Sequence, residues 1–166
     1  MHNDDLIFLR LVELRDAALI LGWETNKGLG RYTEIDAPLT IGFIEAIIKE
    51  QHNVFDTGQV RFIICNSHTN MPVGMVDLYN IDFIIESAEV GIAIVDSINR
   101  RKGFASAALD EIKEYAANVI GVYCLRSFVE VDNLPSSILF KSLGYEIEES
   151  NVGMLGKKMN IYKLEF

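Results

Sequence analysis

The stretch from Ala88 to Ala117 most constrains what this chain can fold into. Its first part, Glu89–Val95, is a β-branched run that is too short for an ordinary helix and therefore predicts a strand. From Gly103 onward, apolar residues recur at close to the 3.6-residue helical period, at Phe104, Ala108, Ile112, Tyr115 and Val119. A strand, a loop and a long amphipathic helix, followed by another strand, make a β–α–β unit, so one parallel strand pair is expected.

Between that strand and that helix lie three consecutive cations, Arg100, Arg101 and Lys102. Cations are unfavourable beside a helix N-terminus, which already carries a partial positive charge and free N–H groups. They become favourable if a polyanion binds there, and Gly103 and the small Ala105 let the backbone approach such an anion closely. The loop therefore predicts a diphosphate-binding site. A solvated basic turn that offsets an acidic surface is the alternative interpretation.

The loop contains neither of two common phosphate-binding patterns. A P-loop would end in Gly-Lys-Ser/Thr, and a dinucleotide-binding loop would read Gly-x-Gly-x-x-Gly. The six residues from Arg100 read Arg-Arg-Lys-Gly-Phe-Ala instead. This segment resembles motif A of the GCN5-related N-acetyltransferase (GNAT) superfamily, whose loop binds the pyrophosphate of acetyl-CoA. The resemblance implies a site for acetyl-CoA formed by Arg100, Arg101, Lys102, Gly103, Phe104, Ala105 and Ser106.

Further segments match one branch of that superfamily in order and spacing. They are Leu9-Arg10-Leu11 with Asp16, Trp23-Glu24, and Asn133-x-x-Ser136 followed by Leu139-Phe140-x-x-Leu143-Gly144-Tyr145. These segments resemble the ribosomal-protein and spermidine N-acetyltransferases. The run Val73–Leu78, followed by Ala88-Glu89, looks like a strand pair of the spermidine enzymes.

Composition bounds the class of protein. The 166 residues are 49% hydrophobic, which predicts one globular domain over 1–166. A formal net charge of −9 disfavours nucleic acid as a partner. No apolar run reaches membrane-spanning length and the first residues lack a signal-peptide pattern, so we expect a cytoplasmic protein with no membrane partner. Cys65 and Cys124 are expected to be buried free thiols, and three widely spaced histidines predict no metal site.

The hydrophobic pattern also predicts the order of elements. Strands are expected over Leu6–Val12, Val60–Cys65, Val73–Tyr79, Glu89–Val95, Val122–Val131, Tyr145–Glu149 and Lys158–Phe166, the last two as an antiparallel pair. Helices are expected over Glu13–Leu21, from an N-cap at Thr40 to about Gln51, from Gly103, and over Ser136–Leu143; Asn26–Pro38 and Asn80–Ser87 are read as connections. This order matches the GNAT fold. It implies an α+β domain with a mixed, mostly antiparallel central sheet, flanking helices, and one parallel β–α–β unit that carries the CoA site.

The resemblance also indicates where chemistry would occur. The protonated form of a primary amine has a pKa of about 10, and the amine attacks a thioester only after that proton is lost. Glu89 stands where relatives often carry the base and is the first candidate, with an exposed glutamate at a sheet edge as the alternative. Asp77 is the second candidate, as base or as the residue that holds a cationic acceptor. On an alternating strand Met75, Asp77 and Tyr79 share one face, and Tyr79 and Glu24 complete the expected acceptor site.

The oxyanion and the leaving group need their own partners. The resemblance implies that backbone N–H groups at Ile92, Ala93, Ile94 and Val95 stabilise the oxyanion. Asn133 resembles a residue that hydrogen-bonds the pantetheine arm, with a turn-forming residue as the alternative. Phe140 stands where many relatives have a tyrosine that protonates the thiolate; its ring can pack against CoA but cannot donate a proton. Ser136 is expected to supply the proton unless it only caps the short helix, and Ser137 and Tyr145 are weaker candidates.

The leading hypothesis is an acetyl-CoA-dependent N-acetyltransferase in which a primary amine attacks the thioester directly. The acceptor is a polyamine, a peptide or protein N-terminus, or an amino sugar. A non-catalytic acyl-CoA-binding or sensing module is the alternative, which Phe140 favours, and a protein that binds another diphosphate is a third hypothesis. The apolar segment Phe83-Ile84-Ile85 would suit an interface in a homo-oligomer.

Overall fold

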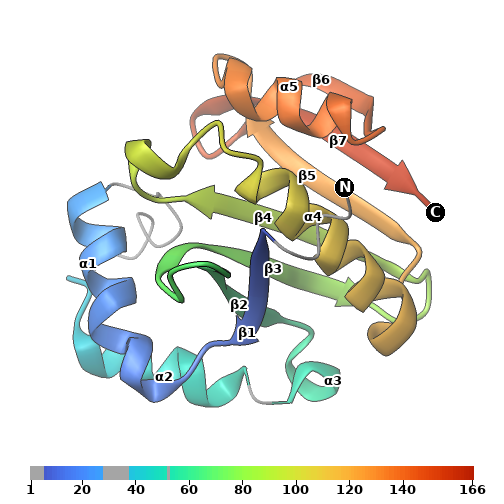
Figure 1. Cartoon of the computed structure of the whole chain (residues 1–166). Coiled ribbons are helices and arrows are strands. Elements are labelled where there is room, and N and C mark those ends of the chain that lie inside the picture. Colours follow the sequence, from blue (N-terminus) through green and yellow to red (C-terminus); the bar gives the residue numbers. More distant parts are fainter. Residues whose placement is uncertain (1–5, 28–37, 52) are drawn as a thin grey trace.

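A computed structural model describes residues 6–27, 38–51 and 53–166, which form one mixed sheet with helices packed against it (Figure 1). The strands are β1 (Ile7–Leu11), β2 (Val60–Asn66), β3 (Pro72–Asp82), β4 (Ser87–Ile94), β5 (Cys124–Glu130), β6 (Glu146–Met154) and β7 (Lys157–Glu165). Their order across the sheet is β1-β2-β3-β4-β5-β7-β6. The helices are α1 (Ala17–Lys27), α2 (Ile41–Glu50), α3 (Val54–Thr57), α4 (Phe104–Tyr115) and α5 (Leu134–Ser142).

Neighbouring strands in this sheet are antiparallel, except for the parallel pair β4 and β5. This confirms the expected α+β class with a single parallel pair, connected through α4. The parallel ladder joins Ser87–Glu89 only to Cys124–Arg126. Beyond Glu89, β4 remains paired with β3, whereas β5 continues beside β7. The sheet is therefore split between β4 and β5 toward the C-terminal ends of both strands (Figure 1).

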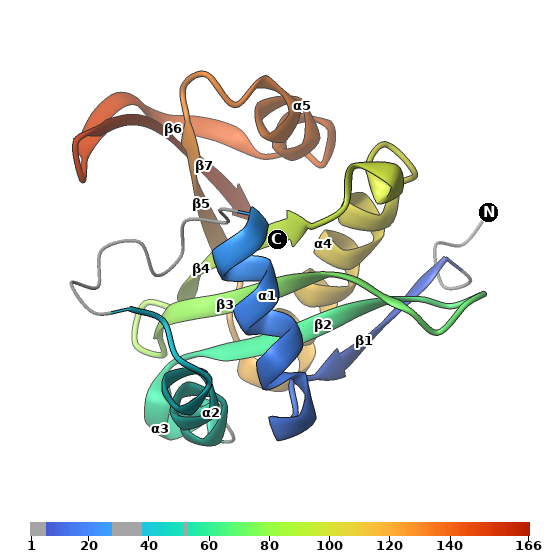
Figure 2. The ribbon, with the colours of Figure 1, turned by 90° about the vertical axis from the view of Figure 1, so that its left-hand side faces the viewer.

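The two faces of the sheet carry separate hydrophobic cores, because successive side chains of a strand point to opposite faces. On one face α4 buries Ala108 and Ile112 in a cluster that includes Val90 of β4. On the other face α1 and α2 pack over a cluster that includes Ile63 of β2 and Met75 of β3 (Figure 2). Whether a residue occupies an odd or an even position along its strand thus determines which face its side chain is on and which helices it packs against.

Local sequence explains where several helices begin and end. The expected N-cap Thr40 accepts a hydrogen bond from the Phe43 N–H (3.2 Å), and α2 begins at the next residue. The side-chain oxygen of Asn133 likewise accepts from the Ser136 N–H (3.2 Å) at the start of α5. Ser136 is therefore not the cap of this helix, because Asn133 holds that place. Gly144 follows α5 with φ +85°, the left-handed conformation that commonly ends a helix.

The predicted end of the first helix is wrong. α1 continues to Lys27 instead of ending at Leu21, so Trp23 and Glu24 lie inside the helix rather than at its end. Burial of Trp23 in the core shared with α2 outweighs the low helix propensity of Gly22. Most of the connection predicted over Asn26–Pro38 falls at residues 28–37, outside the described residues.

Several strand boundaries also differ from the prediction. β6 extends to Met154 rather than Glu149, and its largely exposed side chains carry little hydrophobic pattern, so pairing with β7 determines its length. β3 extends to Asp82, into the segment predicted as a connection, and β4 begins at Ser87. The sequence pattern did not predict the single turn of α3.

Two remaining expectations concern the cysteines and the membrane. Both cysteines are free thiols, but only Cys65 is buried; Cys124, at the start of β5, is half-buried. Within the described ranges, the helices are too short or too polar to cross a bilayer.

Candidate active site

A cleft of about 660 Å³ opens where the sheet splits between β4 and β5. The end of α2 with β2, β3 and β4 lines one side, and β5, α5 and the β6–β7 hairpin line the other. The cleft brings together residues that the sequence predicted as site residues: Asp77, Tyr79, Glu89, Ile92, Asn133, Ser136 and Phe140. Segments that are far apart in the chain therefore meet at one place, the split in the sheet.

Strand register explains why three of these side chains meet. In the β3–β4 ladder, Tyr79 lies opposite Glu89 and Asp77 lies opposite Gly91. Residues two apart on a strand share a face, so Asp77 and Tyr79 both point to the α2 side of the sheet. Met75 packs in the core on that side, which confirms the expected common face of Met75, Asp77 and Tyr79.

Asp77 is buried and already has a cationic partner. Arg61 of β2 lies opposite Asp77 in the ladder and donates a hydrogen bond to each carboxylate oxygen, from Nε to Oδ1 (2.9 Å) and from Nη2 to Oδ2 (2.9 Å). A bidentate guanidinium balances the charge of the carboxylate. This argues against Asp77 as the base and as the residue that holds a cationic acceptor. Arg61 was missed from the sequence, although one arginine inside the apolar run Val60–Cys65 signals a buried partner.

Glu89 differs from Asp77 because it forms no ion pair with any described residue. It is half-buried and is the last residue of β4 that pairs with β5, so its carboxylate lies where the split begins. β4 runs in the middle of the sheet, which excludes the alternative of a glutamate on an edge strand. A half-buried carboxylate with no cation beside it can accept a proton from an amine or from water.

α5 carries Ser136 and Phe140 into the cleft together, because residues four apart lie on one face of a helix. Phe140 is buried and its ring packs against Tyr145 (centroids 5.0 Å apart) and Tyr162 (6.1 Å). It forms an apolar wall without a proton donor, and Ser136 presents a hydroxyl one helical turn away. Asn133 acts as a capping residue and also lines the cleft, while its contact with a pantetheine arm stays a prediction.

The two weaker candidates for the acid do not line the cleft. Ser137 is buried within α5. Tyr145 is also buried, and its hydroxyl has no hydrogen-bond partner among the described residues. Burial, followed by the charges of Asp110 and Cys124, raises the pKa of the Tyr145 phenol well above its usual value. Neither residue is placed to protonate a leaving group in the cleft.

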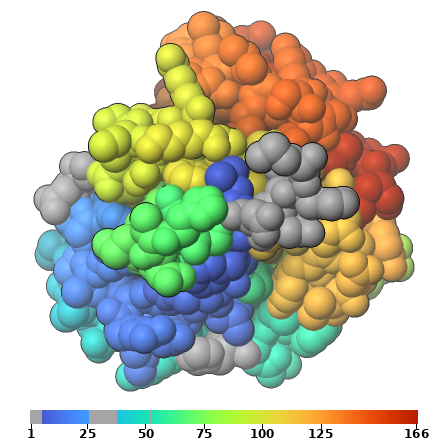
Figure 3. All heavy atoms as spheres, in the orientation of Figure 1, coloured from blue at the N-terminus to red at the C-terminus, as the bar shows by residue number. Residues whose placement is uncertain are grey.

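The basic loop leaves the end of β4 and leads into α4, and its segment projects from the molecular surface (yellow-green in Figure 3). The Arg100 side chain folds back onto the end of β4, where Nε donates to the Ile94 carbonyl oxygen (3.1 Å) and Nη2 donates to that of Val95 (3.2 Å). Arg101 and Lys102 are exposed and form no ion pair with the described residues. Two of the three predicted cations thus have no carboxylate partner in the described part of the chain, and the third holds the end of β4.

The backbone of this loop is shaped for a close approach to a ligand. Arg101 adopts φ +60°, which is uncommon for a residue with a side chain, and Gly103 adopts φ +84°. α4 begins at Phe104 with no acidic residue in its first turn. The Phe104 side chain is buried in the core, so only its backbone can face a ligand, whereas Ala105 and Ser106 are half-buried. Free N–H groups of the helix beside two unpaired cations suit a phosphate group.

One positioning residue escaped the sequence analysis. Gly74 of β3 lies against β4 so closely that a Cβ atom there would sit 2.1 Å from the Ala93 carbonyl oxygen. Only glycine permits that approach, because the obstructing atom belongs to the backbone. Gly74 therefore allows the path that β4 takes along the split. A glycine inside the β-branched strand Val73–Tyr79 was the available signal.

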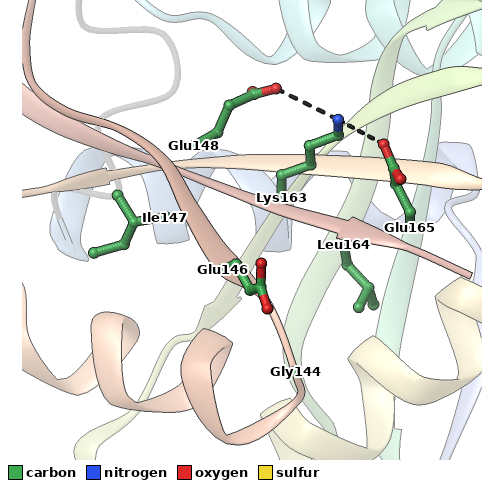
Figure 4. A pocket seen from close by; sticks show the side chains of 7 residues that line it. All are labelled: Gly144, Glu146, Ile147, Glu148, Lys163, Leu164 and Glu165. Carbon is green, nitrogen blue, oxygen red and sulfur yellow. Dashed lines mark ion pairs between the residues drawn. The ribbon is translucent and has the colours of Figure 1, made fainter.

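The structure gives less support to the other predicted or possible sites. Glu24 is buried within α1 and does not line the cleft, so the structure does not bring it to the acceptor site. No group of three or more His, Cys, Asp or Glu side chains that could share a metal ion occurs within residues 6–27, 38–51 and 53–166. A second hollow of about 380 Å³ lies along β6 and β7. There Lys163 reaches between Glu148 and Glu165, 3.7 and 2.6 Å away, and no predicted site residue lines it (Figure 4).

Comparison with known sequences gives a family. A family model described as the acetyltransferase (GNAT) domain matches residues 7–146. Among curated proteins, an uncharacterized N-acetyltransferase p20 from Bacillus licheniformis is 26% identical over 141 residues, which covers 84% of this chain and 79% of that protein.

Solved structures share the fold. A dodecameric spermidine N-acetyltransferase from Vibrio cholerae matches with a TM-score of 0.76 at 21% identity, over 97% of this chain and 93% of that one. A probable acetyltransferase matches with a TM-score of 0.79 at 21% identity, over 98% and 94%. A Vibrio cholerae spermidine/spermine N-acetyltransferase in complex with manganese ions matches with a TM-score of 0.74 at 20% identity, over 99% and 94%. At such identities the likeness establishes the fold and nothing further.

Proposed function

The chain belongs to the GNAT acetyltransferase family, and from this premise we propose that it transfers an acetyl group from acetyl-CoA to a primary amine. The observation that carries the proposal is the position of Glu89, a carboxylate without an ion pair among the described residues, where the cleft enters the split in the sheet. The residues suited to binding acetyl-CoA, the acetyl donor, lie along the split between β4 and β5 and in the loop after β4. The residues suited to the chemistry line the cleft.

The donor site would use two kinds of group. Arg101 and Lys102 would provide cations for the diphosphate, and the first N–H groups of α4, from Phe104 to Ser106, follow them directly in the chain. Gly103 fits this role because residues with a Cβ atom rarely adopt its φ of +84°. A Cβ atom there would also lie only 3.3 Å from the Leu6 side chain. Arg100 supports the site indirectly, by holding the carbonyl groups that end β4.

The split itself would hold the pantetheine arm and the thioester. From Val90 to Ile94, β4 has no ladder partner on its β5 side within the described residues. Its backbone from Ile92 to Ile94 is therefore the candidate for contacts with the arm and the thioester carbonyl, whereas the predicted contact at Val95 is disfavoured because the Val95 N–H donates to the Val73 carbonyl oxygen (3.0 Å). Asn133 and the ring of Phe140 lie across the cleft and would contact the arm from the α5 side.

The residues of the cleft then divide the chemistry. Acetyl-CoA supplies the thioester whose carbonyl carbon the amine attacks. Glu89 accepts the proton that the amine loses, directly or through one water molecule, and backbone N–H groups after Gly91 stabilise the carbonyl oxygen as it becomes negative. Ser136 returns a proton to the sulfur as the C–S bond breaks. A C–N bond thus replaces a C–S bond; of the two protons that the ammonium nitrogen loses overall, one ends on the sulfur and the other passes to solvent.

A non-catalytic acyl-CoA-binding module is the second candidate, and one observation favours it. Phe140 is buried between two tyrosine rings and offers no proton donor at the place where many relatives have one. A module of this kind would bind acetyl-CoA through the same loop without releasing free thiol.

We also propose that the protein forms a homo-oligomer. The solved spermidine N-acetyltransferase named above is dodecameric. In this chain the turn between β3 and β4 exposes Phe83, Ile84 and Ile85, with 41%, 93% and 65% of their surface accessible. Apolar side chains clustered in this way are suited to contact between copies.

Thiol release from acetyl-CoA tests the proposed function. We expect turnover with at least one class of primary amine among polyamines, peptides with free N-termini, amino sugars and simple alkylamines. Glu89→Gln should then lower kcat at neutral pH by about 100-fold, since general bases contribute effects of that order. Its affinity for acetyl-CoA should stay within twofold of wild type, because Glu89 acts on the acceptor.

Glu86→Gln is the matched control, since Glu86 is an exposed glutamate in the turn just before β4. It should leave both kcat and affinity unchanged. An unaltered kcat in Glu89→Gln would show that Glu89 is not the base and that another residue accepts the proton. Binding of acetyl-CoA without turnover on any amine would favour the non-catalytic module.

A further inference from the structure

The charges that line the cleft narrow the class of acceptor, in an inference that rests on the proposed function. Among the described residues the lining contains three carboxylates, those of Asp77, Glu89 and Glu130. Arg61 grips Asp77, and the Lys157 Nζ atom lies 2.5 Å from Glu130 Oε1 at the exposed rim. Glu89 has no such partner within the described ranges. Among the described residues, the cleft lining therefore keeps one carboxylate that no cation pairs with, that of Glu89.

A polyamine would bring more cations than the carboxylates in the described lining of this cleft can match. Amino groups titrate near pH 10, about as lysine does, so each is cationic at neutral pH. The first ammonium would lie beside Glu89, but the other carboxylates in the described lining are already paired with Arg61 or Lys157 and would not be available to a second one. Burying an ammonium group without a partner is strongly unfavourable. The described lining of the cleft is therefore matched to a single positive charge.

Much of the remaining wall is apolar. The apolar part consists of Ile47 of α2, Phe128 of β5, and Met154, Leu155 and Met159 of the β6–β7 hairpin; Gln51, Gln59, Asn80 and Ser127 add neutral polar groups to the lining. Methionine side chains are flexible and adapt to the shape of an apolar ligand. Leu155, at the tip of the hairpin, is 71% exposed and adopts φ +53°, a conformation that leucine rarely takes. An apolar group bound in the cleft would cover this side chain.

We propose that the acceptor is a primary amine that carries a single positive charge on an apolar body, and not a polyamine. The amine nitrogen would sit at Glu89 while the body packs against Phe128, Met159 and Leu155. Two sources share this chemistry: small alkyl- or aralkylamines, and peptides that begin with a large apolar residue. Each methylene buried against this wall is expected to raise kcat/KM about fourfold.

The direct test compares hexylamine with diaminohexane, which differ in the second charge but not in chain length. We expect kcat/KM for thiol release to be at least tenfold higher for hexylamine. Phenylethylamine and the amide of Met-Gly-Gly then distinguish the two sources, with the amide of Gly-Gly-Gly as the control that lacks an apolar side chain. A wild-type protein that uses diaminohexane as well as hexylamine would overturn the inference and leave the proposed function standing.

A variant pair isolates the charge of the wall. Leu155→Glu places a second carboxylate at the cleft, and Leu155→Gln changes size and polarity similarly without adding charge. The ratio of kcat/KM for diaminohexane over hexylamine should rise about tenfold in Leu155→Glu relative to Leu155→Gln. An equal ratio in the two variants would also overturn the inference. No thiol release with any of the amines would refute the proposed function, and this inference with it.

Discussion

Three carboxylates illustrate what single residues contribute to this protein. Arg10 grips Asp16 through two hydrogen bonds of 2.7 Å, and Arg61 grips Asp77 through two of 2.9 Å. Glu89 has no cation paired with it among the described residues. A carboxylate held at both oxygens by a guanidinium fixes one strand or helix against another. A carboxylate without such a partner is available for proton transfer, which is why Glu89 rather than Asp77 is proposed as the base.

The Arg10–Asp16 pair predicts how stability depends on pH. Burial by itself raises the pKa of Asp16, but hydrogen bonds from Arg10 and the Glu13 N–H (2.8 Å), with the Arg10 charge, lower it overall. A lowered folded-state pKa adds stability above the unfolded pKa of about 4 and loses it as pH falls through the folded value. Asp16→Asn should therefore destabilise the protein by about 1–3 kcal/mol at pH 7. In urea unfolding the difference from wild type should shrink as the pH drops below 4; a difference independent of pH would contradict this account.

The identity of the acid can be decided by two substitutions of the same kind, each of which removes one hydroxyl. Ser136→Ala should lower kcat by about tenfold, less than a typical general acid because a thiolate is a fair leaving group. Tyr145→Phe should leave kcat within twofold and raise the unfolding free energy by up to about 1 kcal/mol, since the buried phenol has no described partner. A large loss of kcat in Tyr145→Phe instead would assign the acid to Tyr145.

At the scale of elements, the site depends on how β4 is held between its neighbours. β3 pairs with β4 along most of its length, while β5 leaves it after Glu89. The loop after β4 then turns into α4, with Arg100 bound to the last carbonyl groups of the strand. One strand thus carries the proposed base near its start, the proposed oxyanion contacts along its unpaired edge, and the proposed diphosphate loop after its end.

Gly74→Ala tests the close approach of β3 and β4. The added Cβ would lie 2.1 Å from the Ala93 carbonyl oxygen, so β4 must shift. We expect a loss of about 1–3 kcal/mol in unfolding free energy and at least fivefold weaker binding of acetyl-CoA by calorimetry. Gly42→Ala, in α2 with no atom within 4 Å of the new Cβ, is the control and should gain about 0.5–1 kcal/mol. Unchanged binding in Gly74→Ala would separate this contact from the site.

The basic loop has a charge test of its own. Replacing Arg101 and Lys102 together by alanine should raise the Kd for acetyl-CoA by about tenfold or more and flatten its dependence on salt, because both cations are exposed and unpaired among the described residues. Lys113→Ala, near the other end of the same helix, removes one cation away from the loop and should not change the Kd. An affinity that survives the double substitution would refute the assignment of the loop to the diphosphate.

At the scale of the whole molecule, the charge and the exposed apolar surface act in opposite directions. A formal net charge of −9 keeps copies apart at low salt. The turn between β3 and β4 nevertheless exposes Ile84 at 93% and Ile85 at 65%, and the Phe83 ring stacks on Phe55 of α3 (centroids 5.6 Å apart). Contact between copies through this turn would bury apolar surface that is otherwise in water.

Light scattering at two salt concentrations checks this expectation. The wild-type protein should have a mass above the 18.7 kDa of one chain, and the larger species should be favoured at higher salt, where repulsion is screened. Ile84→Glu should shift the mass toward a single chain. Ile138→Glu, at another exposed isoleucine (68%, on α5), serves as the control and should not. A wild-type mass of one chain at both salts would rule out this interface.

Much of the fold and part of the site were readable from the sequence, for a local reason. The period of the apolar residues after Gly103 predicts α4, and the cap at Thr40 predicts α2. Three cations before a helix predict an anion site in the same way. The limits of this approach appear in α1 and β6, where burial of Trp23 and pairing with β7 override weak local signals.

The sequence by itself determined the order of elements, the basic loop and the candidate residues on β3, β4 and α5, because each depends on neighbours within a few positions. Only the tertiary structure decided what those candidates face. It paired Asp77 with Arg61, left Glu89 without a described partner, and opened the sheet between β4 and β5. Such pairings depend on the register between strands that are distant in the chain, and no pattern within one segment specifies that register.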